Sequence, residues 1–402
     1  MYNNLKVLHL FNSYLPKTEI WAYQLIRHLP DVEIHIGANN YLRHNYYNSD
    51  FHFIDNPLSS LARKDFVIDQ SLSYRFLRKA LLKIAHPVFG LSKRRISKYV
   101  RDHQIELIHA HFADIGCAHI PLIKALKIPF FVSFYGWDYE RLPFTKPVYK
   151  KYYQELFNIA DQIICEGENG KNTLVKMGCP PEKLTVNHLG VAVSQIPFKV
   201  KTKKENQLSI IQIASFMQKK GHIYTVAAFK KALTSAPNMQ LCLVGVAQEN
   251  EIKDKLIEAI KNTPLEKNIV IIPGIDYNQI HDFLSDYDVF IQPSCYSDLM
   301  DCEGGAPIAI LDAQSIGMPI ISTNHCDIPE EVVDKKTGIL VPEKTIDELS
   351  EAILTFYRMH PSEYKTYSQN ARKHVVENYE ITKNAANLKA HYDRIIAKRN
   401  NS

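Results

Sequence analysis

Short apolar segments alternate with helical patterns along almost the whole chain. The apolar segments are rich in Val, Ile and Phe and predict buried strands, whereas the segments between them repeat apolar residues at helical spacing. This alternation predicts β–α–β units, and therefore parallel sheets covered by helices on both faces. In the first half, the predicted strands are residues 6–12, 32–38, 106–112, 129–136, 162–167 and 183–190, and the predicted helices include 18–29, 116–127 and 169–178.

The pattern pauses over residues 191–206, which are charged, contain proline and lack periodicity, and we interpret this stretch as a linker. The alternation then restarts. Strands are predicted at 208–215, 240–246, 268–274, 288–294 and 319–324, and a long helical tail at 361–398. A chain of 402 residues is long for one core, since single cores rarely exceed about 300 residues. We therefore predict two doubly wound, Rossmann-like α/β domains, residues 1–190 and 207–376, that face each other across a cleft.

Composition places the protein among ordinary globular chains, with 46% hydrophobic and 23% charged residues. No apolar run approaches the roughly 18 residues of a membrane span. The N-terminal segment lacks a small-residue cleavage site, so we expect no signal peptide. Seven scattered cysteines without a C-x-x-C pair favour reduced thiols in a cytoplasmic protein.

The net charge is only +5, but the basic residues are unevenly distributed. Between Arg75 and Arg101 there are nine Lys or Arg residues, no acidic residue, and apolar residues at roughly helical spacing. Such a segment suits an anionic membrane surface, and a solvated helix face is an equally open interpretation. We expect no nucleic-acid partner, because no nucleic-acid motif accompanies the segment.

The stretch MDCEGGAPIAILDAQSIGMP, residues 300–319, combines a flexible turn with a following helix. Gly304, Gly305 and Ala306 are expected to leave backbone N–H groups uncovered, and Pro307 suits the first turn of the helix. The helix would direct its positive end at the turn, which could cradle a diphosphate, while Asp312 could accept hydrogen bonds from a ribose. Taken alone, the stretch fits an ordinary loop–helix junction better.

Two further stretches follow predicted strands. Lys219 and Lys220 precede Gly221 at the carboxyl edge of the second sheet, where a lysine can meet a phosphate, although a solvated pair is equally ordinary. In VSFYGWDYERLP, Tyr135, Trp137 and Asp138 surround a glycine. Aromatic rings beside a carboxylate are typical of carbohydrate surfaces, and a packed turn is the alternative.

Metal and cofactor motifs are weak. His109 and His111 alternate in HAHFA, and we expect them to point to opposite faces of the strand end, which argues against one shared metal. His111 would then be the cleft residue of the two. Cys295, Cys302, His325 and Cys326 are too irregularly spaced for a zinc site. The chain has no Gly-x-Ser-x-Gly elbow, P-loop or dinucleotide glycine pattern, so a nicotinamide enzyme is poorly supported.

In order along the chain, these segments resemble the family 4 glycosyltransferases of the GT-B fold. The resemblance covers nearly the whole chain and rests on PKTEIWAYQLIRHL, HAHFADIG, IPFFVSFYGWD, QKKGHIYTVAAF, DCEGGAP and DIPEEVVDKKTGILV. Each piece is degenerate, but the ordered set is specific. EGGAP and HCDIPEEV are similar to a subgroup associated with bacterial exopolysaccharide, capsule and lipopolysaccharide assembly.

The resemblance implies a retaining sugar transfer from a nucleotide sugar to a lipid-linked or polysaccharide acceptor, with no metal or other cofactor required. It also implies a place in the cytoplasm, on the inner face of the plasma membrane, and closing helices, residues 377–402, that cross back onto the first domain. The residues implied as catalytic are Lys220, Glu303 and Tyr135; on the donor side Ser215, Lys220, Gly245, Glu303, Gly304, Gly305, Ala306, Pro307 and Asp312; and on the acceptor side Glu19, His111, Trp137 and Asp138.

The chain departs from the family pattern at four positions. Ser215 stands where the family has an arginine five residues before its lysine. Glu303 lies one position too early for the family's Glu-x7-Glu motif, in which Asp312 replaces the second glutamate. Tyr135 stands in place of a histidine and does not titrate near neutral pH. No general base is assigned.

Two alternatives keep the fold but change the function. A non-catalytic partner subunit would explain the missing arginine and the shifted glutamate, and slow hydrolysis of a nucleotide sugar by the purified protein would argue against it. A nucleotide-sugar epimerase or a phosphorylase is the other alternative. EGGAP and HCDIPEEV argue against it, and a phosphate-dependent reaction would support it.

Overall fold

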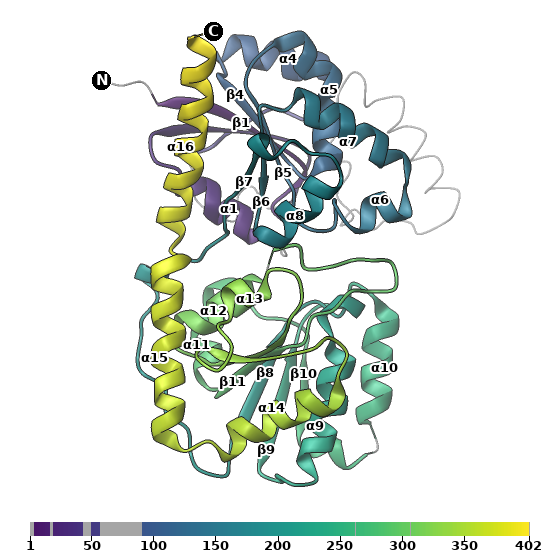
Figure 1. Ribbon diagram of the computed structural model, residues 1–402, viewed down its shortest axis with the longest axis vertical. Coiled ribbons are helices and arrows are strands. Elements are labelled where there is room, and N and C mark those ends of the chain that lie inside the picture. Colours follow the sequence, from purple (N-terminus) through teal and green to yellow (C-terminus); the bar gives the residue numbers. More distant parts are fainter. Residues whose placement is uncertain are drawn as a thin grey trace.

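Two α/β domains lie one above the other, and a pair of helices runs along one side of both (Figure 1). The computed structural model describes residues 4–16, 19–42, 50–56, 91–261, 263–305 and 307–401. Ala306 and the first part of the basic segment, residues 75–90, lie outside the described residues. No helix in the described part is both long and apolar enough to cross a membrane.

The first domain is built on a parallel sheet of seven strands in the order β3-β2-β1-β4-β5-β6-β7. Its strands are β1 (Leu5–Tyr14), β2 (Val32–Tyr41), β3 (His52–Phe53), β4 (Leu107–His111), β5 (Phe130–Ser133), β6 (Gln162–Cys165) and β7 (Leu184–Val186). Its helices are α1 (Ile20–Arg27), α4 (Lys93–Asp102), α5 (Ala113–Leu126), α6 (Arg141–Thr145), α7 (Val148–Ile159) and α8 (Glu168–Lys176).

The second domain repeats this plan with six parallel strands in the order β10-β9-β8-β11-β12-β13. Its strands are β8 (Leu208–Ile213), β9 (Met239–Val244), β10 (Ile269–Ile272), β11 (Val289–Gln292), β12 (Ile320–Thr323) and β13 (Gly338–Val341). Its helices are α9 (His222–Leu233), α10 (Asn250–Ile260), α11 (Ile280–Ser285), α12 (Ile308–Ser315), α13 (Ile328–Glu331) and α14 (Ile346–Arg358). The predicted fold class, two facing doubly wound domains, is confirmed.

Central strands of both sheets are buried along their whole length, which explains why the sequence predicts them. Every residue of β4, β5, β11 and β12 is buried, because helices cover both faces of each sheet. Such strands appear in the sequence as nearly continuous apolar runs. The strands β3 and β13 were not predicted, since β3 has only two residues and the two middle residues of β13 are only partly buried.

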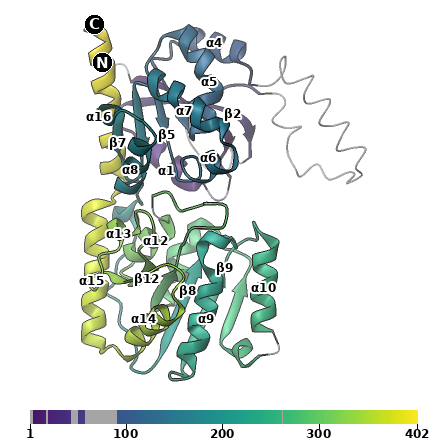
Figure 2. The same ribbon diagram turned by 45° about the vertical axis from the view of Figure 1, so that its right-hand side comes forward.

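The helical tail is two helices, α15 (Pro361–Asn378) and α16 (Ile381–Asn400), which bridge both domains in the two views (Figures 1 and 2). The break between them pairs with the start of the linker. The N–H of Val191 donates to the carbonyl of Tyr379 at 3.1 Å, and the N–H of Ile381 donates to the carbonyl of Val191 at 3.0 Å. Beyond the break, α16 packs into the first domain, where Leu388, Tyr392 and Ile395 join its core. Both chain crossings between the domains therefore lie side by side.

Candidate active site

A cleft with a volume of about 820 Å³ separates the two domains, and side chains from both of them line it. It lies where parallel strands of both sheets end, as expected for ligand sites in doubly wound folds. Among the residues implied by the sequence, the cleft wall contains Glu19, Tyr135, Trp137, Ser215, Lys220, Glu303, Pro307 and Asp312.

Lys220 and Glu303 form the closest ion pair of the cleft, with Nζ and Oε2 2.5 Å apart. Lys220 ends a short 3-10 helix, Gln218–Lys220, and its carbonyl accepts a hydrogen bond from the side chain of Gln212 on β8. Gly221 follows with φ at +69°, and a Cβ there would lie 2.0 Å from the carbonyl oxygen of Pro293. Only glycine fits this turn, so the chain turns into α9 with Lys220 at the cleft.

Glu303 is held as a carboxylate. Its Oε1 atom accepts hydrogen bonds from Ser294 Oγ at 2.6 Å and Gln292 Nε2 at 3.3 Å. Burial alone would raise the pKa of Glu303, but the charges of Lys220 and Lys219 and the hydrogen bonds outweigh it and lower the pKa to about 2. Glu303 is therefore fully ionised at neutral pH and is unsuited to donate a proton.

A second charged cluster lies beside this pair and joins the two domains. Asp301 is almost fully buried and contacts two cations through different oxygens. Lys219 Nζ lies 3.1 Å from Oδ1, and Nη1 of Arg141, at the start of α6 in the first domain, lies 2.9 Å from Oδ2. Lys219 also donates to the carbonyl of Cys302 at 2.6 Å. Burial lowers the pKa of Lys219, but the charges of Glu303 and Asp301 outweigh it and raise the pKa overall.

Asp312 sits on α12 and is 1% exposed, although it reaches the cleft wall. Tyr277 Oη donates to its Oδ1 atom at 3.1 Å, and His281 Nε2 lies 2.9 Å from the same oxygen. These contacts fix the orientation of the Asp312 carboxylate. Gly245 lines a neighbouring cavity of about 670 Å³, where a Cβ would collide with the carbonyl of Ala214 at 1.9 Å.

The glycine turn contacts the first domain, which corrects the expectation of uncovered N–H groups. The N–H of Gly305 donates to Glu166 Oε2 at 2.8 Å. Gly304 has φ at +82°, and a Cβ there would lie 2.4 Å from the carbonyl oxygen of Tyr135. Neither glycine belongs to the cleft wall. Ala306 lies outside the described residues. The turn thus serves as a contact between the domains.

Three carboxyl groups of the cleft wall have raised pKa values. Burial, together with the neighbouring charge of Asp114, raises the pKa of Glu19 to about 7. Burial likewise raises the pKa of Asp114 itself. Burial and the charges of Asp327 and Asp138 raise the pKa of Glu166 to about 8, against the opposing hydrogen bond from Gly305. Glu19 and Glu166 can therefore exchange protons near neutral pH, unlike Glu303.

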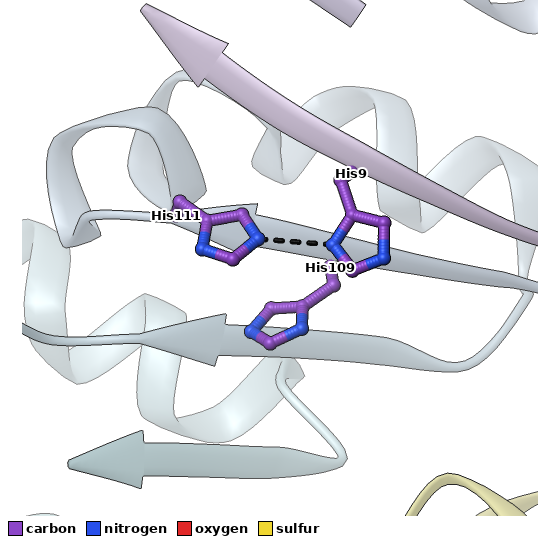
Figure 3. A group of neighbouring side chains, drawn as sticks. All are labelled: His9, His109 and His111. Carbon is purple, nitrogen blue, oxygen red and sulfur yellow. Dashed lines mark hydrogen bonds between the residues drawn. The ribbon is translucent and has the colours of Figure 1, made fainter. Parts of the chain in front are cut away.

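His9, His109 and His111 form a buried group on β1 and β4 (Figure 3). The expectation that His109 and His111 point to opposite faces is wrong, because alternate residues of a strand lie on the same face. Their rings stack at a centroid distance of 4.5 Å. One ring nitrogen from each of the three lies within 4.8 Å of the others.

These histidines form a hydrogen-bond network that ends at the cleft. Tyr135 Oη lies 2.7 Å from His111 Nδ1, and His111 Nε2 lies 2.9 Å from His9 Nδ1. His109 bonds to the hydroxyls of Tyr392 and Ser133. Burial lowers the pKa of all three histidines, to about 3 for His109, so the rings are neutral. His111 reaches the cleft only through Tyr135, and a metal would have to displace the network.

Asp138 also lies behind the cleft wall and not in it. It is fully buried, and its two oxygens accept hydrogen bonds from the N–H groups of Ala113 and Tyr135, both at 2.9 Å. Asp138 therefore holds the start of α5 and the position of Tyr135. Burial raises its pKa to about 7.

Sequence reasoning missed the contacts that require both domains. No role was predicted for Arg141, Glu166, His9 or Asp301, although Arg141 and Asp301 lie inside stretches discussed above. No local pattern marks them, because their partners lie far away along the chain.

Two family models match this chain, one over each domain. The model described as "Glycosyltransferase Family 4" matches residues 19–195, and the model described as "Glycosyl transferases group 1" matches residues 194–374. Together they span both domains. The chain belongs to the family 4 glycosyltransferases. The resemblance found in the sequence is thereby confirmed.

Curated relatives of this glycosyltransferase carry names from polysaccharide assembly. The colanic acid biosynthesis glycosyltransferase WcaL of Escherichia coli is 29% identical over 276 residues, which are 67% of this chain and 66% of WcaL. The match spans just under two thirds of that relative. An Escherichia coli UDP-Gal:α-D-GlcNAc-diphosphoundecaprenol α-1,3-galactosyltransferase is 22% identical over 321 residues, 75% of this chain and 79% of the relative.

Among solved structures, HepE of Anabaena, in complex with UDP and glucose, superposes on this glycosyltransferase with a TM-score of 0.70. The superposition covers 97% of this chain and all of that chain, at 14% identity. At this identity the likeness concerns the fold.

Proposed function

We propose that the protein transfers a sugar, with retention, from a nucleotide-sugar donor to a lipid-linked or polysaccharide acceptor during bacterial surface polysaccharide biosynthesis. The proposal rests mainly on one observation: the paired Lys220 and Glu303 lie in a cleft lined by both domains, beside the ordered carboxylate of Asp312. The relatives' names, colanic acid synthesis and transfer to a diphosphoundecaprenol-linked sugar, support the acceptor class.

On the donor side, the departing nucleoside diphosphate gathers negative charge as the glycosidic bond breaks. Lysine side chains already ordered in a cleft stabilise such charge without reorganisation during the reaction. Lys220 is held by Glu303, and Lys219 by Asp301 and the carbonyl of Cys302. Asp312 suits the ribose, because Tyr277 and His281 orient its carboxylate. HepE, which holds UDP and glucose, supports this class of donor.

On the acceptor side, the first domain contributes Glu19, Trp137 and Tyr135 to the cleft wall. Trp137 offers a ring face for sugar C–H groups. Glu19, whose pKa is about 7, can hydrogen-bond to an acceptor hydroxyl and exchange its proton near neutral pH. Tyr135 keeps its proton, because burial raises its pKa above the ordinary range, and it can donate to the transferred sugar.

The proposed reaction needs no metal or other cofactor, because cationic side chains supply the charge that the diphosphate requires. It also needs no nucleophile from the enzyme if the acceptor attacks the sugar from the same face from which the leaving group departs. In that case retention follows from the geometry of attack within the closed cleft. No residue is therefore assigned as a general base.

A thermal-shift panel of UDP, GDP, ADP and their sugars tests the donor class. A ligand that binds only the native state raises the melting temperature, so the stabilising nucleotide identifies the donor base. A sugar-transfer assay with that donor and a diphosphoundecaprenol-linked sugar then tests the acceptor. Absence of stabilisation by every nucleotide would contradict the proposal.

We also propose that the segment Arg75–Arg101 attaches the protein to the anionic inner face of the plasma membrane. Its charge supports the idea, and its described part includes α4, which carries Lys93, Arg94 and Arg95 in its first turn. Each basic residue near an anionic surface contributes about 1 kcal/mol. Flotation with anionic vesicles is expected for the native chain and not after charge reversal of the segment. Equal flotation of both proteins would contradict this attachment.

A further inference from the structure

Three of the described side chains in the cleft wall carry a full positive charge: Lys219, Lys220 and Arg141. The two lysines come from the second domain, and Arg141 comes from α6 of the first domain. Ser215, on the wall of the second domain, offers a hydroxyl and no charge. Among the described residues, Arg141 is therefore the cation that approaches the cleft from the side of the first domain.

Most of the hydrogen-bonding capacity of Arg141 is unused. A guanidinium group carries five N–H donors in a planar fork. Within the described residues, only Nη1 makes a hydrogen bond, to Asp301 Oδ2 at 2.9 Å. The side chain remains 29% exposed, whereas that of Asp301 is 3% exposed. The arginine is thus anchored through one nitrogen, and its partly exposed side chain lines the cleft.

The charges around Arg141 leave room for an anion. Lys220 is neutralised by Glu303, so that pair has no net charge. Lys219 and Arg141 share the single carboxylate of Asp301, and this trio has a net charge of +1. The excess positive charge is local to this trio, where it favours an anionic group of a ligand, and a guanidinium fork matches phosphate oxygens in a bidentate way.

We propose that Arg141 contacts the diphosphate of the nucleotide donor and stabilises it as the leaving group. This proposal rests on the proposed function and adds a residue from the first domain to the donor site. Arg141 and Asp301 lie on different domains, so their ion pair forms only while the cleft is closed. Arg141 reaches the diphosphate held by the second domain in the same closed arrangement. Closure would then add Arg141 to the two lysines, so that the leaving group is stabilised fully only when both substrates are enclosed.

The experiment compares each nucleoside diphosphate with its own nucleoside, using UDP and uridine, GDP and guanosine, and ADP and adenosine, by calorimetric titration. For the pair that the native protein binds, Arg141→Gln should weaken diphosphate binding by about tenfold or more, the loss expected for a charge-assisted hydrogen bond. Nucleoside binding should stay unchanged, which also shows that the variant is folded. The diphosphate affinity of Arg141→Lys should lie between those of the native protein and Arg141→Gln, because lysine keeps the charge and loses the guanidinium fork.

Two further variants distinguish a direct contact of Arg141 with the diphosphate from a purely structural role of Arg141. Arg358→Gln is the matched control, since Arg358 also pairs with one carboxylate, that of Glu351, but lies exposed on α14. It should bind every ligand as the native chain does. Asp301→Asn removes the cross-domain ion pair and a negative charge, so the diphosphate should bind at least as tightly as to the native chain.

Several results would overturn the role of Arg141. One is unchanged diphosphate binding in Arg141→Gln, and another is an equal loss of diphosphate and nucleoside binding. A third is a loss in Asp301→Asn as large as in Arg141→Gln, which would make the arginine only a latch between the domains. If the native protein bound none of the nucleotides, the proposed function itself would fail, and this result is distinguishable from the other three.

Discussion

Lys220 and Glu303 depend on each other for their charged states. The carboxylate is almost fully buried, and its low pKa exists because two lysines and two hydrogen-bond donors surround it. The pair explains how Glu303, although out of the family's register, can serve the proposed donor site. Its observed role is to order Lys220 at the place where the diphosphate is proposed to leave.

Lys220→Gln should lower turnover by about 100-fold, because one preorganised positive group at the leaving group is lost. The variant also leaves a buried carboxylate without its cation, which costs roughly 3–5 kcal/mol of stability. The double variant Lys220→Gln with Glu303→Gln removes that unpaired charge. Steady-state kinetics and urea unfolding distinguish the two effects.

The matched control for this prediction is Lys231→Gln. Lys231 also pairs with a single carboxylate, that of Asp347, but on the exposed surface, where such pairs contribute little. Its turnover should equal that of the native protein. Native turnover in a folded Lys220→Gln or double variant would contradict the leaving-group role.

Glu166→Gln should stabilise the protein progressively as pH rises. The pKa of Glu166 is raised from 4.5 to about 8, first by burial and then by Asp327 and Asp138, so the folded state binds this proton more tightly than the unfolded state. The stability it contributes is present below pH 4.5 and is lost as pH rises to 8. Glutamine stays neutral and still accepts from Gly305, so it suffers no such loss.

Chemical unfolding of both proteins between pH 5 and 9 measures this effect. The difference in unfolding free energy should grow in favour of the variant across that range. Glu182→Gln, at an exposed position, serves as the control. A difference that is constant with pH would show that Glu166 does not lose its proton near neutrality in the folded state.

Helix α16 belongs to the second domain in sequence but to the first domain in packing. Its buried face joins the core formed by β1, β2 and α1, and Tyr392 bonds to His109 on β4 at 2.6 Å. Because this hydroxyl and the imidazole are both fully buried, each satisfies the polar atom of the other. The helix thus ties the end of the chain to the strand that also carries His111.

Tyr392→Phe should destabilise the first domain by about 1–3 kcal/mol, since it leaves a buried ring nitrogen without its partner. Both tryptophans of the chain, Trp21 and Trp137, lie in that domain, so fluorescence during urea unfolding reports on it. Tyr152→Phe, at a tyrosine that is 44% exposed, should change stability very little. An unchanged midpoint in Tyr392→Phe would mean that the hydroxyl does not satisfy His109.

The two domains meet in a closed arrangement through backbone contacts that only glycine permits. A Cβ on Gly136 would lie 2.2 Å from Cα of Gly304 across the domain boundary. Each domain also supplies a carboxylate that accepts a hydrogen bond from a backbone N–H of the other domain. Glu166 binds the N–H of Gly305, and Asp327 binds the N–H of Asn169 at 2.6 Å. The side-by-side crossings at Val191 and Glu380 provide the place about which these faces can separate.

Gly136→Ala should keep the cleft open, because the added methyl group collides with backbone and not with a movable side chain. Turnover should fall on the order of 100-fold, as expected when reacting groups are displaced by about 1 Å. Small-angle scattering should show a larger radius in the presence of nucleotide than for the native chain. A native radius and native turnover would contradict the close contact.

Gly178→Ala is the matched control for this effect. Gly178 also has a left-handed backbone, with φ at +93° against +95° for Gly136, so alanine is equally strained there. Its neighbour is the flexible side chain of Gln154 and not the opposite domain. The variant should lose some stability and keep both the native radius and native turnover.

The sequence by itself determined most of the strands, the two-domain plan, the family and the placing of Lys220 at a sheet edge. Apart from the family, these depend on residues close together along the chain, because periodic burial and turn chemistry are local properties. The ordered motifs added specificity that no single segment has. The joint presence of Glu303 and Asp312 in the cleft wall also followed from one short stretch.

Only the tertiary structure decided which groups face each other across the cleft. Arg141 and Asp301 are 160 residues apart, and Glu166 and Gly305 are 139 apart, so no local pattern connects them. Their pairing arises from how two separately patterned domains pack against each other. Packing within the first domain placed His111 and Asp138 behind the cleft, and packing between the domains used the N–H of Gly305, since burial depends on neighbours distant in sequence.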